Sequence, residues 1–304
     1  MRKPILLTVL LLSAMPTWAD DCEDAGAALT RKDFVAALRP LTACAKQGYA
    51  PAQSNLGIMY DKGDGVQQDF KAAVHWYTLS AEQGNADAQG NLGWMYSNGK
   101  GVPQDDKEAM RWFTKAAKQG NADAQGNLGW MYSNGKGVPQ DDKEAVRWYT
   151  LAAGQGIRMA QSNLGGMYAN GKGVPQDYKA AVHWYAKAAE QGYALAQYGL
   201  ANLYHEGKGA PQDYKAAVHW LTLSAEQGNA DAQTNLGAMY ASGQGVPQNY
   251  VLAHMWRNLA ASNGENESSV EARDALASMM TPAQIAEAQA MAKRCLASHY
   301  KDCE

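Results

Sequence analysis

One segment of this chain occurs twice, letter for letter, 36 residues apart. Residues 91–109 read NLGWMYSNGKGVPQDDKEA, and residues 127–145 read the same. The same step separates six glutamines and six tryptophans, at Gln53, Gln89, Gln125, Gln161, Gln197 and Gln233 and at Trp76, Trp112, Trp148, Trp184, Trp220 and Trp256. Self-similarity of this period is typical of repeat architectures. We therefore divide residues 51–266 into six repeats.

Each repeat predicts two helices joined by a glycine-rich turn. In the second repeat we expect a first helix near residues 88–97 and a second near residues 105–119. Asp105 is an N-cap and Glu108 would complete a capping box with it, while Gly120 ends the helix. A single pair of helices cannot bury its own apolar face, so the pairs must stack on one another. The predicted fold class is an all-α solenoid of stacked helical hairpins.

The repeat pattern resembles that of a known family. Ala-x-x-x-Leu-Gly-x-x-Tyr-x-x-Gly-x-Gly-Val-x-x-Asp, followed by Ala-x-x-Trp-Tyr and Ala-Ala-x-x-Gly, is similar to Sel1-like repeats, the 36-residue relatives of tetratricopeptide repeats. The resemblance covers nearly all of the chain after its first residues. It implies a right-handed superhelix whose first helices line a concave groove, and a role as an adaptor or scaffold.

The N-terminal residues are typical of an export signal. Arg2 and Lys3 precede an eight-residue apolar run that is too short to span a bilayer, and Pro16 interrupts it. We expect residues 1–19 to form a signal peptide, cut after Ala19, and the mature chain to reside in the periplasm or outside the cell. No later segment is apolar enough for a membrane helix, so we expect no membrane insertion of the mature chain.

Charge excludes nucleic acid as the main partner. Without Arg2 and Lys3, the 27 basic residues fall to 25 against 30 acidic residues, a net charge of −5. Phosphate binding needs concentrated positive charge, and the sequence has no basic stripe.

The two ends of the chain are predicted to cap the solenoid. Residues 20–50 should form a shortened hairpin, with helices near residues 21–29 and 32–47, and residues 267–304 should form capping helices near 270–280 and 282–297. Thr281 and Pro282 mark the start of the last helix. Both caps are polar enough to stop end-to-end stacking, so we expect a monomer.

All four cysteines lie in these end segments. An exported protein meets an oxidising compartment, which favours disulfides. Of three possible pairings we favour Cys22–Cys44, across the antiparallel N-terminal hairpin, and Cys295–Cys303, across the C-terminal tail. Zinc binding is the alternative, although the spacings match no structural zinc pattern.

The chain offers little that predicts catalysis. His75, His183 and His219 share a repeat position with Arg111, Arg147 and Met255, which indicates a partly solvated face. The Gly-Lys-Gly at residues 99–101 lacks the spacing of a phosphate loop, and residues 61–65 lack the ligands of a calcium loop. We expect no catalytic residue, metal or cofactor.

The first helices predict where a partner binds. Their constant positions cover one side and their variable positions the other, and one variable position reads Ile58, Trp94, Trp130, Gly166, Asn202 and Ala238. Glycine or alanine suffices there, so the scaffold does not need Trp94 or Trp130. We predict that both form one aromatic patch, with Asn98 and Asn134 supplying polar contacts. Packing onto adjacent repeats is the alternative.

A second candidate lies farther along. Tyr198 and His205 are seven residues apart and should share a face of one helix. The six recurring tryptophans, by contrast, are expected to serve packing.

The leading hypothesis is a non-catalytic exported scaffold that binds a protein or peptide in its concave groove. One alternative is an enzyme: cysteine-rich members of the family are associated with β-lactam binding and hydrolysis, but they carry a cysteine pair in each repeat, which this chain lacks. The other is a secreted host-interaction factor, which would use the same mechanism at a different location.

Overall fold

Helices make up all the regular structure of the part of the chain that can be described. The computed structural model describes residues 18–263, 267–300 and 303, and over these it has sixteen helices and no strand. Residues 1–17 of the predicted signal segment lie outside the described residues. Among the described helices, none is both long enough and apolar enough to cross a bilayer.

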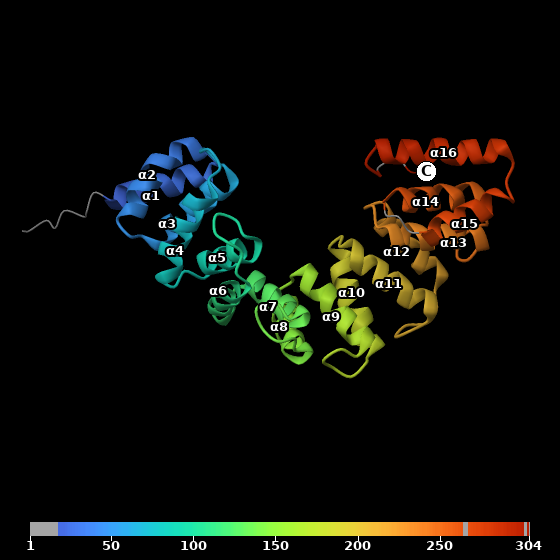
Figure 1. The fold of residues 1–304 in the computed structure, drawn as a ribbon, viewed down its shortest axis with the longest axis horizontal. Helices are drawn as coiled ribbons and strands as arrows, with labels where there is room; N and C mark the ends of the chain where they lie inside the picture. Colours follow the sequence, from blue (N-terminus) through green and yellow to red (C-terminus); the bar gives the residue numbers. More distant parts are fainter. Residues whose placement is uncertain (1–17, 264–266, 301–302, 304) are drawn as a thin grey trace, which may run out of the picture. The chain divides into compact units, whose positions relative to one another are not determined.

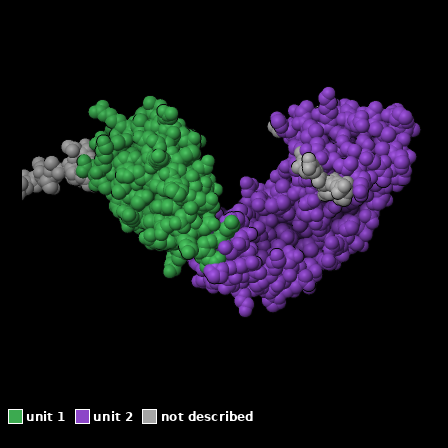
Figure 2. Space-filling model, viewed as in Figure 1, with its two compact units in different colours: residues 1–124, 136–138 green, residues 125–135, 139–304 purple. Residues whose placement is uncertain are grey.

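The chain divides into two compact units, which Figure 2 distinguishes by colour. The first runs to residue 124 and includes residues 136–138; the second comprises residues 125–135 and 139–304. The first unit contains α1 (Trp18–Thr30), α2 (Phe34–Lys46), α3 (Ala50–Lys62), α4 (Phe70–Glu82), α5 (Ala86–Asn98) and α6 (Asp106–Lys118). Most of α7 (Ala122–Asn134) belongs to the second unit, followed by α8 (Asp142–Gly154), α9 (Arg158–Asn170), α10 (Tyr178–Glu190), α11 (Ala194–Glu206), α12 (Tyr214–Ala225), α13 (Ala230–Ser242), α14 (Tyr250–Asn263), α15 (Glu267–Ala277) and α16 (Pro282–Ala297).

Within each unit the helices form stacked hairpins, as predicted. The two helices of a repeat pack against each other, and the second helix packs on the first helix of the next repeat (Figure 1). Thus α3 pairs with α4 and α4 packs on α5, while α9, α10 and α11 make the same arrangement in the second unit. The predicted N-terminal hairpin is present as α1 and α2.

The turn inside each repeat attaches it to the previous hairpin. The first glycine of the Gly-x-Gly turn ends the first helix with a left-handed residue, such as Gly63 at φ 79°. The second glycine also has positive φ, and a Cβ at Gly65 would lie 2.7 Å from the carbonyl oxygen of Phe34, at the start of α2. Only glycine fits this close approach.

The predicted capping box of α6 is only half formed. The Asp105 side chain accepts hydrogen bonds from the backbone N–H groups of Lys107 and Glu108, as an N-cap should. The N–H of Asp105, however, already donates to the carbonyl of Tyr96 at 3.0 Å. Glu108 therefore has no capping role on that group, and its carboxylate pairs with Arg111 at 3.0 Å.

The recurring glutamine joins successive hairpins through buried hydrogen bonds. Gln161 is 4% exposed, and its side-chain nitrogen donates to the carbonyl of Ala153 at 3.1 Å. Its side-chain oxygen accepts from Gln191, 30 residues later, at 2.7 Å. The same pair of bonds recurs at Gln53, Gln89 and Gln197. A buried amide is stable here because both of its ends are satisfied.

The N-terminal hairpin is closed by the disulfide Cys22–Cys44, with Cα atoms 5.4 Å apart. This is the pairing favoured from the sequence. Cys44 is buried beside Leu41, Leu56 and Met59, so the bridge also joins the hairpin to the core of the first repeat. Closing a loop of 22 residues in the unfolded chain stabilises the fold by about 3 kcal/mol.

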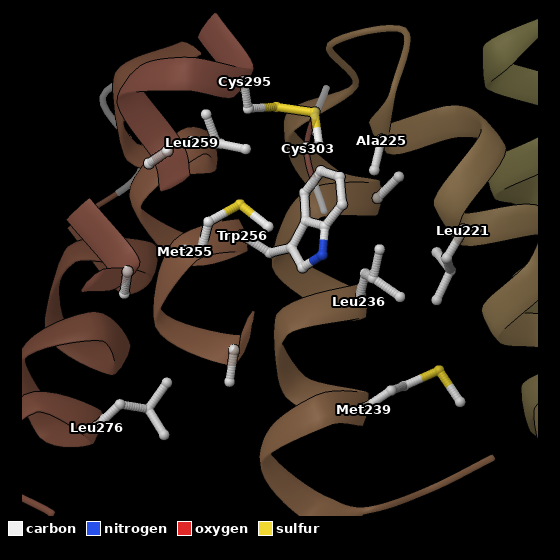
Figure 3. Packing of buried hydrophobic residues seen from close by; sticks show 14 of the residues in the cluster. Leu221, Ala225, Leu236, Met239, Met255, Trp256, Leu259, Leu276, Cys295 and Cys303 are labelled. Atoms are coloured by element: carbon white, nitrogen blue, oxygen red, sulfur yellow. A yellow bond between two sulfur atoms is a disulfide. The ribbon is translucent and has the colours of Figure 1, made fainter. Parts of the chain in front are cut away.

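The C-terminal helices cover the last repeat. Both α15 and α16 pack on α14, and Trp256 of α14 is buried at the centre of a cluster that includes Met255, Leu236 and Leu276 (Figure 3). The second predicted disulfide, Cys295–Cys303, lies at the edge of this cluster. Thr281 caps α16 as predicted, and Gln284 completes a capping box there. The apolar face of the final repeat is thus shielded from water.

Candidate partner-binding surface

The first helix of each repeat has a buried face and an accessible face. Its recurring Ala, Leu and Met side chains are buried, for example Ala88, Leu92 and Met95 of α5. They contact the second helix of the same repeat and that of the one before, which explains why these positions barely change. Most variable positions are exposed or half-buried, but the variable position that holds Ser54, Gly126 and Ser162 is buried in those three repeats, so only part of the predicted free face can contact a partner.

Trp94 and Trp130 lie on the accessible face, and 42% and 41% of their surfaces are exposed. Tryptophan is enriched among the residues that contribute most to binding at protein interfaces. Trp94 belongs to the first unit and Trp130 to the second. That the two indole side chains form a single aromatic patch stays a prediction.

Asn98 and Asn134 are partly committed to their own helices. The side-chain nitrogen of Asn98 donates to the carbonyl of Trp94 at 2.9 Å, and that of Asn134 donates to the carbonyl of Trp130 at 2.8 Å. These bonds fix the amides one turn beyond each indole, with the amide oxygens still able to accept from a partner.

Ile58, at the position equivalent to Trp94, has a packing role. Its side chain is half-buried and rests against the cluster that contains Tyr77 and Leu92. Ile58 is thus a weaker anchor than the two tryptophans.

Tyr198 and His205 line one pocket, as their spacing on one helix face suggested. The pocket has a volume of about 340 Å³ and lies between α11 and α13. Asn202 and Asn235 also line it, and the side-chain nitrogen of Asn235 donates to the side-chain oxygen of Asn202 at 3.1 Å. The ring of His205 meets that of Tyr214 edge-on at 5.3 Å, which orients the imidazole.

A pocket that the sequence analysis did not foresee surrounds Trp130. It has a volume of about 330 Å³ and lies between α7 and α9. Asn134 lines it with Trp130, and Tyr149, Asn163 and Lys172 are among its other lining residues. Tyr149 and Lys172 lie outside the first helices, so a comparison restricted to those helices could not find them. The near-constant asparagine at position 163 was visible as a pattern.

The second helices present a different surface. His75, His183 and His219 are exposed, and each ring meets the following tryptophan edge-on at 5.0–5.1 Å. Arg111 and Arg147 stack their guanidinium groups over Trp112 and Trp148 from the same position. The predicted partly solvated position is thus confirmed for the histidines and arginines, but it is wrong for Met255, which is buried under the C-terminal helices. The recurring tryptophans are buried or half-buried, as predicted.

The cysteines are not zinc ligands. All four are joined in disulfides, which overturns the zinc alternative. Within the described residues, no group of three or more His, Cys, Asp or Glu side chains could hold a metal ion.

Comparison with known proteins decides the family. A model of the Sel1 repeat matches residues 50–85, 86–121, 122–157, 158–193, 194–229 and 230–265. The chain belongs to the Sel1 repeat family. Sel1 repeats generally mediate protein–protein interactions, so a surface for a protein partner is what this fold provides.

Two solved structures of Sel1 repeat proteins resemble this one. A Sel1 repeat protein from Oxalobacter formigenes is 35% identical, with a TM-score of 0.72, over 79% of this chain and 96% of that one. The protective antigen c5321 of uropathogenic Escherichia coli strains is 26% identical, with a TM-score of 0.51, over 94% of this chain and 86% of that one. Comparison with curated proteins gave no match.

Proposed function

We propose that this Sel1 repeat protein is a non-catalytic scaffold that binds a protein or peptide partner along its first helices. The observation that carries the proposal is the exposure of Trp94 and Trp130 at a position where two of the other repeats have only Gly166 or Ala238. Each indole leaves about two fifths of its surface in water, at 42% and 41%, and a large apolar side chain so exposed gains free energy when a partner covers it. A partner that covers them would gain both apolar burial and a polar contact at each neighbouring asparagine.

Within each unit the partner meets a preformed surface. Hairpins joined there by buried glutamines and by the glycine turns hold the binding side chains of that unit in place. The entropic cost of association then falls mainly on the partner, which favours affinity.

We further propose that the protein acts in the periplasm or outside the cell, after removal of residues 1–19. The two disulfides support this location, because such bonds persist in oxidising compartments. The likeness to a protective antigen supports it as well, since an antigen must be accessible to antibodies. The N-terminal sequence of the protein recovered from a periplasmic extract and from culture supernatant tests both the cut and the location.

A pull-down from envelope extract tests the binding surface. The mature chain is compared with Trp94→Ala/Trp130→Ala and with Leu151→Ala, which removes a similarly exposed apolar side chain (44%) from the second helix α8. We expect a partner retained by the wild type and by Leu151→Ala but lost by the tryptophan variant. Circular dichroism checks that all three fold. Equal retention by all three would show that the tryptophans are not the binding surface.

A further inference from the structure

Two pockets of the second unit occupy the same place in the repeat, two repeats apart. We call them the α7–α9 pocket and the α11–α13 pocket, after the first helices between which they lie. Each receives one side chain from the intervening second helix, Tyr149 in one and Leu221 in the other, at equivalent positions. Each also has an asparagine and a buried methionine at equivalent positions of the next first helix, namely Asn163 with Met167 and Asn235 with Met239.

The α7–α9 pocket is cationic. Lys172 is its charged residue, and no acidic side chain lines it. Among the described residues, no carboxylate lies within ion-pair distance of Lys172. Tyr149 and Asn163 line it together, so a phenol hydroxyl and an amide lie beside the ammonium group. An unpaired ammonium group, neutral amides and the exposed indole of Trp130 suit an acidic side chain and its apolar stem.

The α11–α13 pocket has the opposite character. Glu206 is its charged residue, and neither lysine nor arginine lines it. The Glu206 carboxylate pairs with Lys208 at 2.6 Å, but both side chains are nearly half exposed, and such an ion pair is weak and easily exchanged. Tyr198 and His205 add aromatic walls. This combination suits a lysine or arginine side chain.

In the repeat between the two pockets, a side chain of the protein fills the equivalent space. Tyr185 of α10 occupies the position equivalent to Tyr149 and Leu221. A Cβ at Gly199 would lie 2.7 Å from its ring, and a Cβ at Gly166 would lie 3.2 Å from its hydroxyl. Other repeats have asparagine where Gly199 stands. The loss of that side chain makes room for the ring, so a ligand crossing this step finds a closed surface.

From this arrangement we infer that the two pockets bind two side chains of one extended peptide segment, an acidic one at α7–α9 and a basic one at α11–α13. Neighbouring first helices lie about 10 Å apart, so the pockets are about 20 Å apart. An extended chain rises about 3.3 Å per residue, which places the acidic and basic residues about six positions apart. This inference rests on the proposed function, because it specifies the partner of the same surface.

Selection from a phage-displayed library of random 14-residue peptides tests the inference. The mature protein is the bait, beside Lys172→Glu, Glu206→Lys and the control Lys293→Glu, which changes an exposed charge on α16 away from both pockets. We expect peptides with an acidic and a basic residue five to seven positions apart. Synthetic copies should bind Lys172→Glu and Glu206→Lys about tenfold or more weakly, since each variant sets like charges opposite each other. Binding to Lys293→Glu should be unchanged.

The outcomes separate the two ideas. Each charge reversal should also change only the peptide residue that is selected at the substituted pocket. Lys172→Glu should therefore select a basic residue in place of the acidic one and keep the basic residue at the α11–α13 pocket. Peptides that require Trp130 but show no spaced charges, or that bind all variants equally, would overturn the two-pocket inference and leave the scaffold function standing. A library that yields no binder would contradict peptide binding by this surface and the inference together.

Discussion

Tyr185 and Gly199 show how single residues determine whether a pocket forms between two neighbouring first helices. Tyr149 and Tyr185 are the same residue type at equivalent positions, yet one lines a pocket and the other fills the equivalent space. The difference lies in the opposing residue, which is Asn163 against Tyr149 and Gly199 against Tyr185. A change that leaves the fold intact thus redistributes the accessible surface along the first helices.

Substituting Gly199 with alanine should destabilise the protein by about 1–3 kcal/mol, because the new methyl group would overlap the half-buried Tyr185 ring. Gly126→Ala is the matched control: it is also a helical glycine of a first helix, and its Cβ would meet its neighbours at 3.8–3.9 Å, an ordinary contact. It should stabilise by about 0.5–1 kcal/mol, since alanine favours helix. Urea unfolding followed by circular dichroism measures both. Equal effects of the two substitutions would refute the overlap.

The helices at the C-terminal end bury a histidine. His254 of α14 is 2% exposed, and its Nδ1 has no hydrogen-bond partner. Burial lowers its pKa, the charge of Arg273 lowers it further, and Asp274 opposes them. The packing of α15 on α14 therefore depends on a neutral imidazole.

This burial predicts a pH dependence. The folded pKa lies below the ordinary value of 6.5, so on acidification the unfolded chain binds the proton first. Stability from this group is fully present above pH 6.5 and falls as the pH drops below it, by up to about 1.4 kcal/mol per pH unit. His254→Met should remove this slope. The test is urea unfolding of both proteins from pH 7.5 to 5.0, and parallel curves would exclude His254 as its source.

At the scale of the whole molecule, the chain is a series of hairpins that contact mainly their neighbours in sequence. Stability in such a protein is close to a sum over hairpins and the interfaces between them. The caps at both ends matter more than their size suggests, since each replaces a missing neighbour. The disulfides lie in these caps, where the stacking supplies support from one side only.

A deletion in register tests this additivity. Removing residues 158–193 takes out α9 and α10 and joins the end of α8 to the start of α11 as the repeat demands. We expect a folded protein whose helical signal at 222 nm falls in proportion to the two lost helices. Removing residues 158–175 instead deletes α9 alone and leaves α10 without its partner, so that variant should lose cooperative unfolding. Similar behaviour of the two deletions would contradict the hairpin as the unit of stability.

The features that were predictable from sequence are those determined by local chemistry or by topology. Asp105 and Gly120 predicted helix ends because caps act within a few residues, and the antiparallel hairpin brought Cys22 to Cys44. The bonds of Gln161 were not predictable, because their partners lie 8 and 30 residues away. The capping box failed at Glu108 because Tyr96 had already taken the N–H it needed. Lys172 was missed because this turn residue lines a pocket only when its own hairpin packs against the previous one, α7 and α8.

The contact of the turn glycine with the preceding hairpin has a consequence for how such genes change. Gly65 meets the carbonyl of Phe34, and each later repeat meets its predecessor in the same way. A newly copied hairpin therefore arrives with its attachment to the previous one already encoded. The identical stretches at 91–109 and 127–145 are what such a copying event leaves behind. Recombination between repeats can lengthen or shorten the binding surface one hairpin at a time. Each product keeps the glycine contact that attaches one hairpin to the next.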